Sequence, residues 1–181
     1  MSKVNIFFAE GFEEVEALTT VDLLRRAGIE VCMVSVTDKL EVTGSNGIMI
    51  RAEKMFSDIS EADGIILPGG MPGTLNLKAH KELAALINRY NDEGKLLAAI
   101  CAAPTVYGEM KLLVGRHATC YPGMEAGLIG AEALEDSVVI DDHFITSRGV
   151  GTAINFALAI IGYLLNDEAA DKIASAIVYE R

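Results

Sequence analysis

The sequence predicts an α/β fold with a mostly parallel sheet, and two features of it support that prediction. Short apolar runs alternate with longer segments in which apolar residues recur at helical spacing, as in successive βαβ units. The 181 residues contain too few strand–helix pairs for a closed eight-stranded barrel, so we expect an open sheet with helices on both faces. We find no break in composition, linker or internal repeat, and residues 1–181 are therefore expected to form a single domain.

The first half of the chain supplies the first strands and the first helix. Residues 4–8 are apolar and indicate a buried strand. Residues 14–27 have helical periodicity, and Gly28 stands where a glycine commonly ends a helix. Residues 30–36 are apolar and rich in β-branched side chains, which indicates a second strand. Within residues 41–50 a glycine-containing turn separates two short strands.

The second half continues the alternation of strands and helices. Residues 64–67 indicate a short strand that ends in a Pro-Gly-Gly turn, and residues 81–90 indicate a helix. Residues 96–100 indicate a strand that runs directly into a cysteine, and Thr152 stands at the N-cap position of a later helix. The remaining expected elements are a helix at 102–110, an extended segment at 117–120, a strand pair at 137–141 and 143–147, and helices at 152–165 and 167–178.

The charge balance restricts the class of partner. Lys and Arg number 15 and Asp and Glu number 26, which gives a formal net charge of −11. An acidic chain repels a phosphate backbone, so we expect no nucleic-acid partner bound through a basic surface, whereas a small neutral substrate remains compatible. Hydrophobic residues make up 51% and charged residues 23%, a composition that excludes a disordered chain.

The cysteines and the apolar segments indicate a cytoplasmic protein. Cys32, Cys101 and Cys120 are too few and too scattered for a disulfide framework, and no cysteine has metal-ligand spacing. The apolar run at residues 4–9 is too short for a secretory signal, and the segment 153–165 is too short to span a bilayer. We therefore expect a reduced thiol environment, no metal and no membrane partner.

Cys101 is the first candidate for chemistry, because it stands at the carboxyl end of an expected strand, where open α/β sheets place their sites. Ala102 and Ala103 permit a sharp turn from strand into helix, and Pro104 suits the first turn of that helix. A thiol that faces a helix N-terminus would have a lowered pKa and could act as a nucleophile. The alternative is an unreactive core cysteine in an apolar run.

Glycines and carboxylates follow two other expected strands. Gly69 and Gly70 could direct backbone N–H groups at a ligand, as an oxyanion site requires, or form a plain turn. Glu13, Glu14 and Glu16 fall in a first helical turn, where acidic residues interact favourably with the helix dipole and are usually solvated. A carboxylate turned into a pocket beside a thiol would instead have a raised pKa and could carry a proton.

The other candidates have plainer interpretations. Cys32 is expected in the core, and Cys120, beside Tyr121, could line the same pocket as Cys101 or be buried. His80 begins an expected helix and is interpreted as solvated. His143 is interpreted as a surface residue or as a histidine whose polar groups are satisfied.

Taken together, the segments around these candidates resemble the ThiJ/PfpI superfamily and, within it, the DJ-1 branch. The match extends in the family's order from Glu10 to Ile160 and so covers nearly the whole chain. The matching stretches are Glu10-Gly11-Phe12-Glu13-Glu14-Val15-Glu16, Asp22-Leu23-Leu24-Arg25-Arg26-Ala27-Gly28-Ile29, Leu67-Pro68-Gly69-Gly70, Ala98-Ala99-Ile100-Cys101-Ala102-Ala103-Pro104, Thr146-Ser147-Arg148-Gly149-Val150-Gly151-Thr152 and Phe156-Ala157-Leu158-Ala159-Ile160.

The resemblance implies a flavodoxin-like three-layer sandwich, similar to class I glutamine amidotransferases, and a homodimer. It makes Cys101 the reactive cysteine, Glu16 its carboxylate partner, and the backbone N–H groups of Gly70 and Ala102 the oxyanion site. It implies neither a metal nor an organic cofactor. The residues expected to line the pocket beside these groups are Gly69, Cys120 and Tyr121.

The sequence departs from the family pattern at one position. Many relatives carry a histidine close to the cysteine where this chain has Tyr121, which is a neutral donor at pH 7 and cannot act as a histidine-type base. A Cys-His-Asp triad is therefore not supported, and proton transfer falls to Glu16. Peptidase relatives have histidine directly after the cysteine, where this chain has Ala102. Glutamine amidotransferases carry their His-x-Glu after the nucleophile, whereas His80 precedes it. We therefore do not expect peptidase or amidase activity, because no base is positioned for it.

The resemblance thus predicts a cofactor-free enzyme that acts on reactive dicarbonyls, either as a glutathione-independent glyoxalase that converts methylglyoxal to lactate or as a deglycase, in stress protection. The alternative is a redox sensor in which Cys101 oxidises to a sulfinate that a protonated Glu16 stabilises. A chaperone or interaction module is a third class, for which the sequence offers no specific feature. The helix at 14–27, with Arg25 and Arg26 near its end, is the expected dimer contact.

Overall fold

The computed structural model describes residues 2–180, and within them the main sheet has seven strands. The strand order is β10-β11-β7-β6-β1-β2-β5; β10 is antiparallel to β11, and all other neighbours are parallel. This arrangement confirms the predicted α/β fold. The strands of the sheet are β1 (Lys3–Phe8), β2 (Glu30–Ser35), β5 (Lys54–Met55), β6 (Gly64–Leu67), β7 (Leu96–Ile100), β10 (Val138–Asp141) and β11 (Phe144–Ser147).

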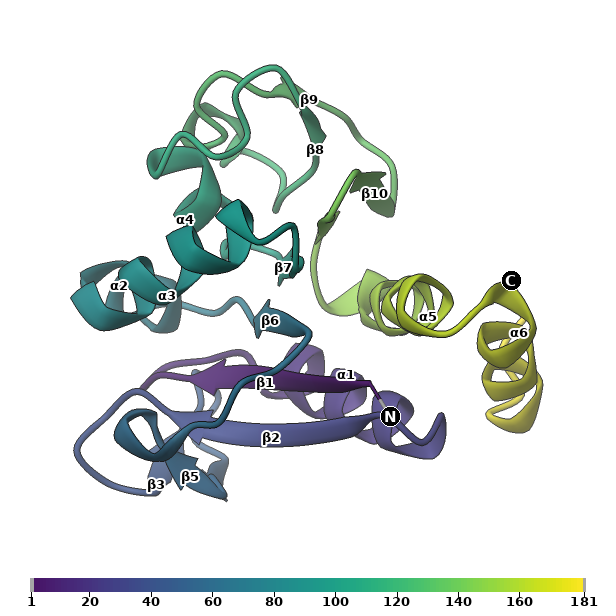
Figure 1. Ribbon diagram of the computed structural model, residues 1–181, viewed down its shortest axis with the longest axis horizontal. Helices are drawn as coiled ribbons and strands as arrows, with labels where there is room; N and C mark the ends of the chain where they lie inside the picture. The colour runs from purple at the N-terminus through teal and green to yellow at the C-terminus, as the bar shows by residue number, and fades with distance from the viewer. Residues whose placement is uncertain (1, 181) are drawn as a thin grey trace.

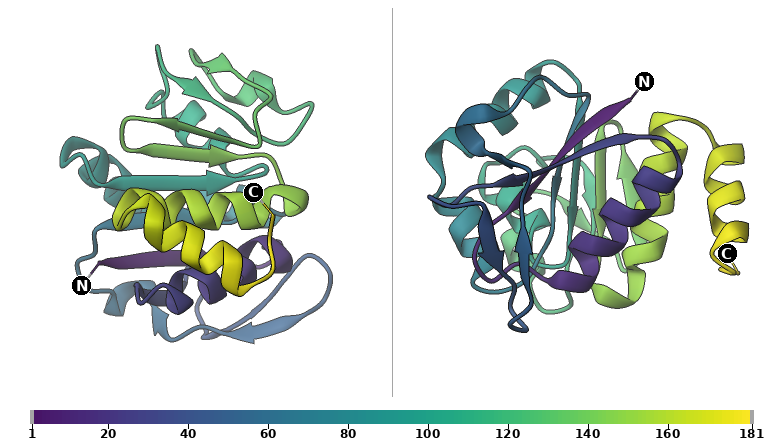
Figure 2. Two further views of the ribbon diagram at one scale, coloured as in Figure 1. Left: turned by 90° about the vertical axis from the view of Figure 1, so that its right-hand side faces the viewer. Right: turned by 90° about the horizontal axis from the view of Figure 1, so that it is seen from below.

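Helices cover both faces of the sheet and make it the middle layer of three (Figure 1). The helices are α1 (Glu14–Arg26), α2 (Gly73–Ala79), α3 (Lys81–Asp92), α4 (Pro104–Glu109), α5 (Ala153–Leu164) and α6 (Asp167–Ala176). Helices α1 and α5 lie side by side on one face with α6 outside them, and α2, α3 and α4 cover the other (Figure 2). Consecutive residues of β1, Phe7 and Phe8, are fully buried in the two different cores, because side chains alternate across a strand.

The order of the strands determines where a site can form. The strand order reverses at β1, because β2 lies on one side of it and β6 on the other. In open α/β sheets such a reversal leaves a crevice outside the carboxyl ends of the two strands concerned, here β1 and β6. The segments that leave these strands meet there, since the N–H of Glu13 donates to the carbonyl of Gly69 at 2.9 Å. The turn after β7 is tied to the end of β11, because the N–H of Cys101 donates to the carbonyl of Ser147 at 2.9 Å.

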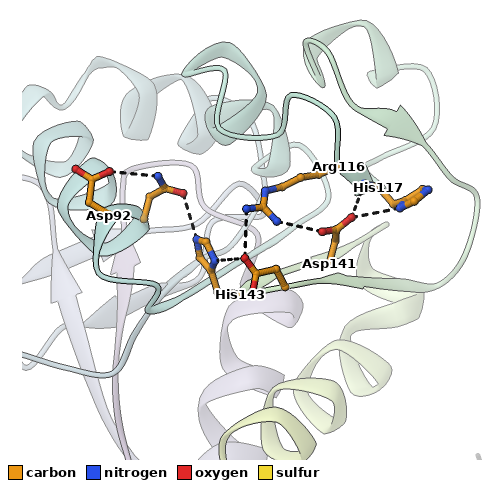
Figure 3. Close-up of polar contacts among 7 residues, drawn as sticks. Asp92, Arg116, His117, Asp141 and His143 are labelled. Atoms are coloured by element: carbon orange, nitrogen blue, oxygen red, sulfur yellow. Dashed lines mark hydrogen bonds and ion pairs between the residues drawn. The ribbon is translucent and has the colours of Figure 1, made fainter.

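Two small strand pairs lie outside the main sheet. They are β3 (Glu41–Thr43) with β4 (Met49–Arg51), and β8 (His117–Ala118) with β9 (Glu132–Ala133). Polar contacts hold the β8 segment to the hairpin between β10 and β11 (Figure 3): Arg116 forms ion pairs with Asp141 at 3.1 Å and Asp142 at 3.3 Å, and a ring nitrogen of His117 lies 3.2 Å from a carboxylate oxygen of Asp141. His143, which is 6% exposed, lies within 3.0 Å of Asp142 and has partners on both ring nitrogens, as expected of a satisfied histidine.

Most of the expected elements are present with ends shifted by one or two residues, and Gly28 follows α1 with a φ of 81° as a helix-ending glycine. Three details differ. The helix expected from residue 102 begins at Pro104, because residues 101–103 form a tight turn. Thr152 does not cap α5 with its side chain; its Oγ1 accepts from the N–H of Gly149 at 3.1 Å. Third, the short elements α2, β5 and β9 are not among the expected elements, because so few residues carry too little periodicity and α2 begins at a glycine.

Candidate active site

Cys101 occupies a strained turn at the carboxyl end of β7. Its φ is 65°, in the left-handed region that residues other than glycine rarely adopt, at a cost of about 1–3 kcal/mol. Two backbone hydrogen bonds hold the turn: the N–H of Cys101 donates to Ser147 at 2.9 Å, and its carbonyl accepts from Tyr121 at 2.8 Å. The surrounding loops thus fix a partly exposed thiol above the sheet edge.

Glu16 provides a buried carboxyl group on the facing helix. It lies in the first turn of α1, which begins where a side-chain oxygen of Glu13 accepts the N–H of Glu16 at 2.7 Å. Glu16 is only 1% exposed, and its Oε2 accepts the N–H of Gly69 at 2.9 Å. Its Oε1 is also buried and has no hydrogen-bond partner among residues 2–180. That free oxygen is available to exchange a proton with a reacting group.

The glycine pair after β6 allows three segments to meet. A Cβ built on Gly69 would lie 2.6 Å from the Cβ of Cys101 and 2.8 Å from Oε2 of Glu16, so no other residue fits there. Gly70 has a φ of 91°, and a Cβ on it would lie 2.4 Å from the backbone nitrogen of Glu13. Both glycines are therefore required sterically rather than forming a plain turn.

The Glu16 carboxyl and the Cys101 thiol shift the pKa of each other. Burial raises the pKa of Glu16 to about 7; contact with the thiol and the N–H of Gly69 oppose the rise, and the charge of Glu13 adds to it. Burial likewise raises the pKa of Cys101 to about 12, and the ionised Glu16 raises it further, whereas the backbone N–H groups of Gly70 and Ala102 lower it. The pair therefore loses one proton near neutral pH and keeps the second.

These directions correct the expectation that a helix N-terminus lowers the pKa of the thiol. Helix α4 starts three residues after Cys101, and burial outweighs the backbone donors. When Glu16 holds the shared proton, its charge no longer opposes ionisation of the thiol, and the N–H groups of Gly70 and Ala102 remain to support a thiolate. Ionisation of this thiol is thus opposed when Glu16 is ionised and less opposed when Glu16 carries its proton.

The pair opens into a depression of about 520 Å³. Cys101 and Glu16 line it together with Glu13, the Tyr121–Pro122 dipeptide and residues 148–152. Of the expected pocket residues, Tyr121 lines the depression and is 51% exposed, whereas Gly69 lies close to both Cys101 and Glu16 and is not among the lining residues. Cys120 is 3% exposed and packs in the core on the α2–α3–α4 side, so it does not line this depression.

The structure places the other candidate residues of the sequence analysis in different environments. Glu14 is buried rather than solvated, because the turn before β4 donates hydrogen bonds to it from the N–H of Asn46 at 2.7 Å and of Ile48 at 3.3 Å. His80 is half-buried and accepts the N–H of Leu83 at the start of α3, and it is not among the residues that line the depression at Cys101. Residues 148–152 belong to a stretch that carries the family resemblance, and they are not among the expected pocket residues although they line the depression. The glycines at 149 and 151 are the sequence signal that could have indicated a backbone segment close to a ligand.

Two further findings concern ligands and membranes. Within residues 2–180, no group of three or more His, Cys, Asp and Glu side chains is arranged so that it could hold a metal ion. Over the same range, no helix has both the length and the apolar character needed to cross a membrane.

Comparison with known proteins agrees with this geometry. The model of the DJ-1/PfpI family matches residues 2–162, which is most of the chain. The chain belongs to the DJ-1/PfpI family. Oxidized DJ-1 from Toxoplasma gondii has 38% sequence identity and a TM-score of 0.97, with all of both chains covered. The expected flavodoxin-like architecture of this family is thereby confirmed.

Curated relatives extend the comparison to proteins of different lengths. Protein DJ-1 homolog B of Arabidopsis thaliana is 40% identical over 97% of this DJ-1/PfpI chain, which covers 41% of that protein. This chain therefore spans less than half the length of the plant relative. Glutathione-independent glyoxalase DJR-1.2 of Caenorhabditis elegans is 35% identical, with 91% of this chain and 89% of that protein covered.

Proposed function

We propose that this DJ-1/PfpI protein is a cysteine-dependent enzyme that detoxifies reactive dicarbonyls without glutathione, as part of a DJ-1-type role in stress protection. Membership of the family and the similarity to a glutathione-independent glyoxalase support this class of activity. The observation on which the proposal rests is the pairing of Cys101 with Glu16, whose buried Oε1 has no hydrogen-bond partner among residues 2–180. A nucleophile and a proton carrier thus share one open depression.

The first step is addition to the aldehyde. The thiol proton of Cys101 passes to Glu16, the sulfur forms a bond to the aldehyde carbon, and the carbonyl electron pair moves to oxygen. The N–H groups of Gly70 and Ala102, which already interact with the sulfur, stabilise the negative charge on that oxygen. Glu16 then returns the proton to the oxygen, and the product is a hemithioacetal.

The second step is an internal rearrangement. The Glu16 carboxylate removes the proton from the former aldehyde carbon, and the electron pair moves towards the adjacent ketone to give an enediol. Glu16 then delivers that proton to the ketone carbon, while the hydroxyl proton of the hemithioacetal passes to the former ketone oxygen, which leaves a thioester carbonyl at the former aldehyde carbon and a hydroxyl at the former ketone carbon. The aldehyde carbon is oxidised and the ketone carbon is reduced, so no external oxidant is needed. Water then hydrolyses the resulting thioester. The net reaction is methylglyoxal plus water to lactate, and the thiol is regenerated.

The deglycase form of the proposal uses the same nucleophile on adducts of dicarbonyls with protein amines or thiols. The test is lactate formation from methylglyoxal without glutathione, in wild type, Cys101→Ser, Glu16→Gln and the control Cys32→Ala, a buried cysteine on β2. We expect activity in wild type and the control, and a loss of a hundredfold or more in the two site variants. Full activity of Cys101→Ser would contradict the proposal.

A redox-sensing role is a second candidate, favoured by one observation. The buried Oε1 of Glu16 has no hydrogen-bond partner among residues 2–180, so a protonated Glu16 could donate to an oxygen of a Cys101 sulfinate. Mild peroxide followed by peptide mass analysis tests it. A gain of two oxygen atoms at Cys101 before Cys32 or Cys120 would support it, and earlier oxidation of those two would contradict it.

We also propose that the chain forms a homodimer through the start of α1 and the β3–β4 hairpin. Glu14 ties these two segments together, and the exposed apolar side chains beside it are Val15, Ile48 and Met49 at 48%, 54% and 64%. Arg25 and Arg26 are instead paired within the chain with Glu53 and Asp22. Light scattering should show a dimer that Met49→Glu dissociates and that Ile140→Glu, on the distant β10, does not; a monomeric wild type would contradict this proposal.

A further inference from the structure

Tyr121 stands beside the reactive cysteine in a fixed position. Its backbone N–H donates to the carbonyl of Cys101 at 2.8 Å, so the two residues cannot move independently. Its ring lies against the loop after β11, since a Cβ built on Gly149 would be 3.5 Å from the ring Cδ2. The ring is nevertheless half exposed, at 51%, and its open side contributes to the depression around Cys101.

Further apolar surface completes this side of the depression. Val150 is 47% exposed and lines the same depression, as does Pro122. Single exposed apolar side chains are ordinary on a protein surface, but here three of them share one concavity with a nucleophile. A reactant held at the sulfur of Cys101 would place its substituent against this surface, which we call the Tyr121–Val150 wall.

Apart from Glu16, the charged side chains at the depression are Arg148 and Glu13, and both form hydrogen bonds within the chain. The guanidinium of Arg148 donates to the backbone carbonyl of Glu135 at 2.9 Å. One carboxylate oxygen of Glu13 accepts the N–H of Glu16 at 2.7 Å. Both side chains have structural roles, which favours recognition of an apolar substituent over recognition of a charged one.

The size of the depression points in the same direction. Its volume of about 520 Å³ lies within the roughly 300–1,000 Å³ typical of pockets for drug-sized ligands. The methyl group of methylglyoxal would leave most of the Tyr121–Val150 wall in water. A phenyl or branched alkyl group would cover it.

We propose that the Tyr121–Val150 wall makes this protein selective for 2-oxoaldehydes with an aryl or bulky alkyl substituent. Tyr121 and Val150 are the specificity-determining residues, and Cys101 and Glu16 perform the same chemistry on every substrate. The inference rests on the proposed function for its reaction, and it concerns which member of the dicarbonyl class the site favours. An apolar group that fills such a pocket discriminates by roughly ten- to two-hundredfold.

The first test compares phenylglyoxal, which would give mandelate, with methylglyoxal, using initial rates so that arginine modification does not contribute. We expect the wild-type kcat/KM to be at least about tenfold higher for phenylglyoxal. Tyr121→Ala should reduce the ratio of the two kcat/KM values by about tenfold, whereas Tyr121→Phe, which keeps the ring, should have the wild-type ratio. Tyr163 is a half-exposed tyrosine on α5 that does not line the depression, so Tyr163→Ala should leave the ratio unchanged. A wild-type ratio near one, or an unchanged ratio in Tyr121→Ala, would overturn the inference.

A second test needs no turnover and separates this inference from the proposed function. The rate at which N-phenylmaleimide alkylates Cys101 is divided by the rate for N-methylmaleimide, and the quotient is normalised to that for glutathione. A normalised ratio well above one in wild type that falls in Tyr121→Ala would support the Tyr121–Val150 wall. This holds even if the protein consumes neither dicarbonyl, and that lack of turnover would contradict the glyoxalase proposal but not the inference about the wall. A normalised ratio of one in wild type would overturn the inference while leaving dicarbonyl turnover in place.

Discussion

The backbone N–H of Gly69 donates a 2.9 Å hydrogen bond to Oε2 of Glu16 and so joins two segments that are 53 residues apart in the chain. The same glycine lies against Cys101, because a Cβ on it would be 2.6 Å from the Cβ of that residue. The loop after β6 therefore determines both the orientation of the carboxyl group and the space available to the thiol. Neither side chain could reach its present position if residue 69 carried a side chain.

Gly69→Ala should accordingly disrupt the Cys101–Glu16 pair. Overpacking the tightly packed position at residue 69 costs about 1–3 kcal/mol of folding stability, and displacement of Cys101 and Glu16 should reduce dicarbonyl turnover by a hundredfold or more. Thermal unfolding and initial rates measure the two effects. Gly162→Ala in α5 is the matched control, since the nearest atom to its added Cβ is the movable Asp167 carboxylate at 3.2 Å. Turnover of Gly69→Ala at the wild-type rate would contradict this account of the loop.

Glu16→Gln should change the pH dependence of stability. Burial raises the folded-state pKa of Glu16 to about 7, above its ordinary value of 4.5. The folded state thus binds the proton more tightly, and the stability that this group contributes is fully present below pH 4.5 and is lost as the pH rises through 7. At 1.36 kcal/mol per pKa unit the loss is on the order of 3 kcal/mol.

Glutamine carries no proton to lose, so the melting temperature of Glu16→Gln relative to wild type should increase between pH 5 and pH 8. Glu13→Gln is the control, because it alters a neighbouring carboxylate that is half exposed. A constant difference between Glu16→Gln and wild type across that range would show that Glu16 is ionised at both pH values.

The same variant should separate thiol acidity from catalysis. The ionised Glu16 raises the pKa of Cys101, so removing its charge should lower the pKa of the thiol. Iodoacetamide alkylation as a function of pH should show this downward shift, with peptide mass analysis confirming the site. Turnover should nevertheless fall a hundredfold or more, because the proton carrier is gone. A variant with a more acidic thiol and undiminished turnover would exclude Glu16 as the proton carrier.

Glu14 should have the opposite pH signature from Glu16. Burial alone would raise the pKa of Glu14, but hydrogen bonds from Asn46 and Ile48 outweigh it and hold the pKa below its usual range. The stability that Glu14 contributes is therefore present above pH 4.5 and is lost as the pH falls through its lower folded-state pKa.

Glu14→Gln should destabilise the protein by about 1–3 kcal/mol at pH 7 and by less at pH 3, because the neutral amide loses charge-assisted hydrogen bonds that wild type also loses in acid. Thermal unfolding at the two pH values measures the difference. Hydrogen exchange should locate the change at the 44–48 turn, and equal destabilisation at both pH values would indicate a packing effect instead.

The sequence determined the parts of this protein that depend on local patterns. Apolar runs and helical spacing identified the main strands and all the longer helices, since these periods are set by backbone geometry. The sequence was also sufficient to identify the family. The features that identified it are Cys101 at the end of a strand, the glycines at 69 and 70, and the resemblance of the surrounding segments. Short elements such as α2 and β5 were missed, because a few residues hold too little periodicity to detect.

The tertiary structure decided which of the chemically similar residues faces which environment. Glu13, Glu14 and Glu16 are near neighbours on one helix turn, yet Glu14 accepts hydrogen bonds from a hairpin while Glu16 faces a thiol. Cys101 directly follows β7 and packs against the core on the α1–α5 side, whereas Cys120, which follows the separate β8–β9 pair, is buried in the core on the α2–α3–α4 side. Burial and the direction of neighbouring N–H groups set their pKa values, and both depend on segments far away in the chain. No local pattern encodes those distances, so the mutual influence of Glu16 and Cys101 on their pKa values is a property of the fold.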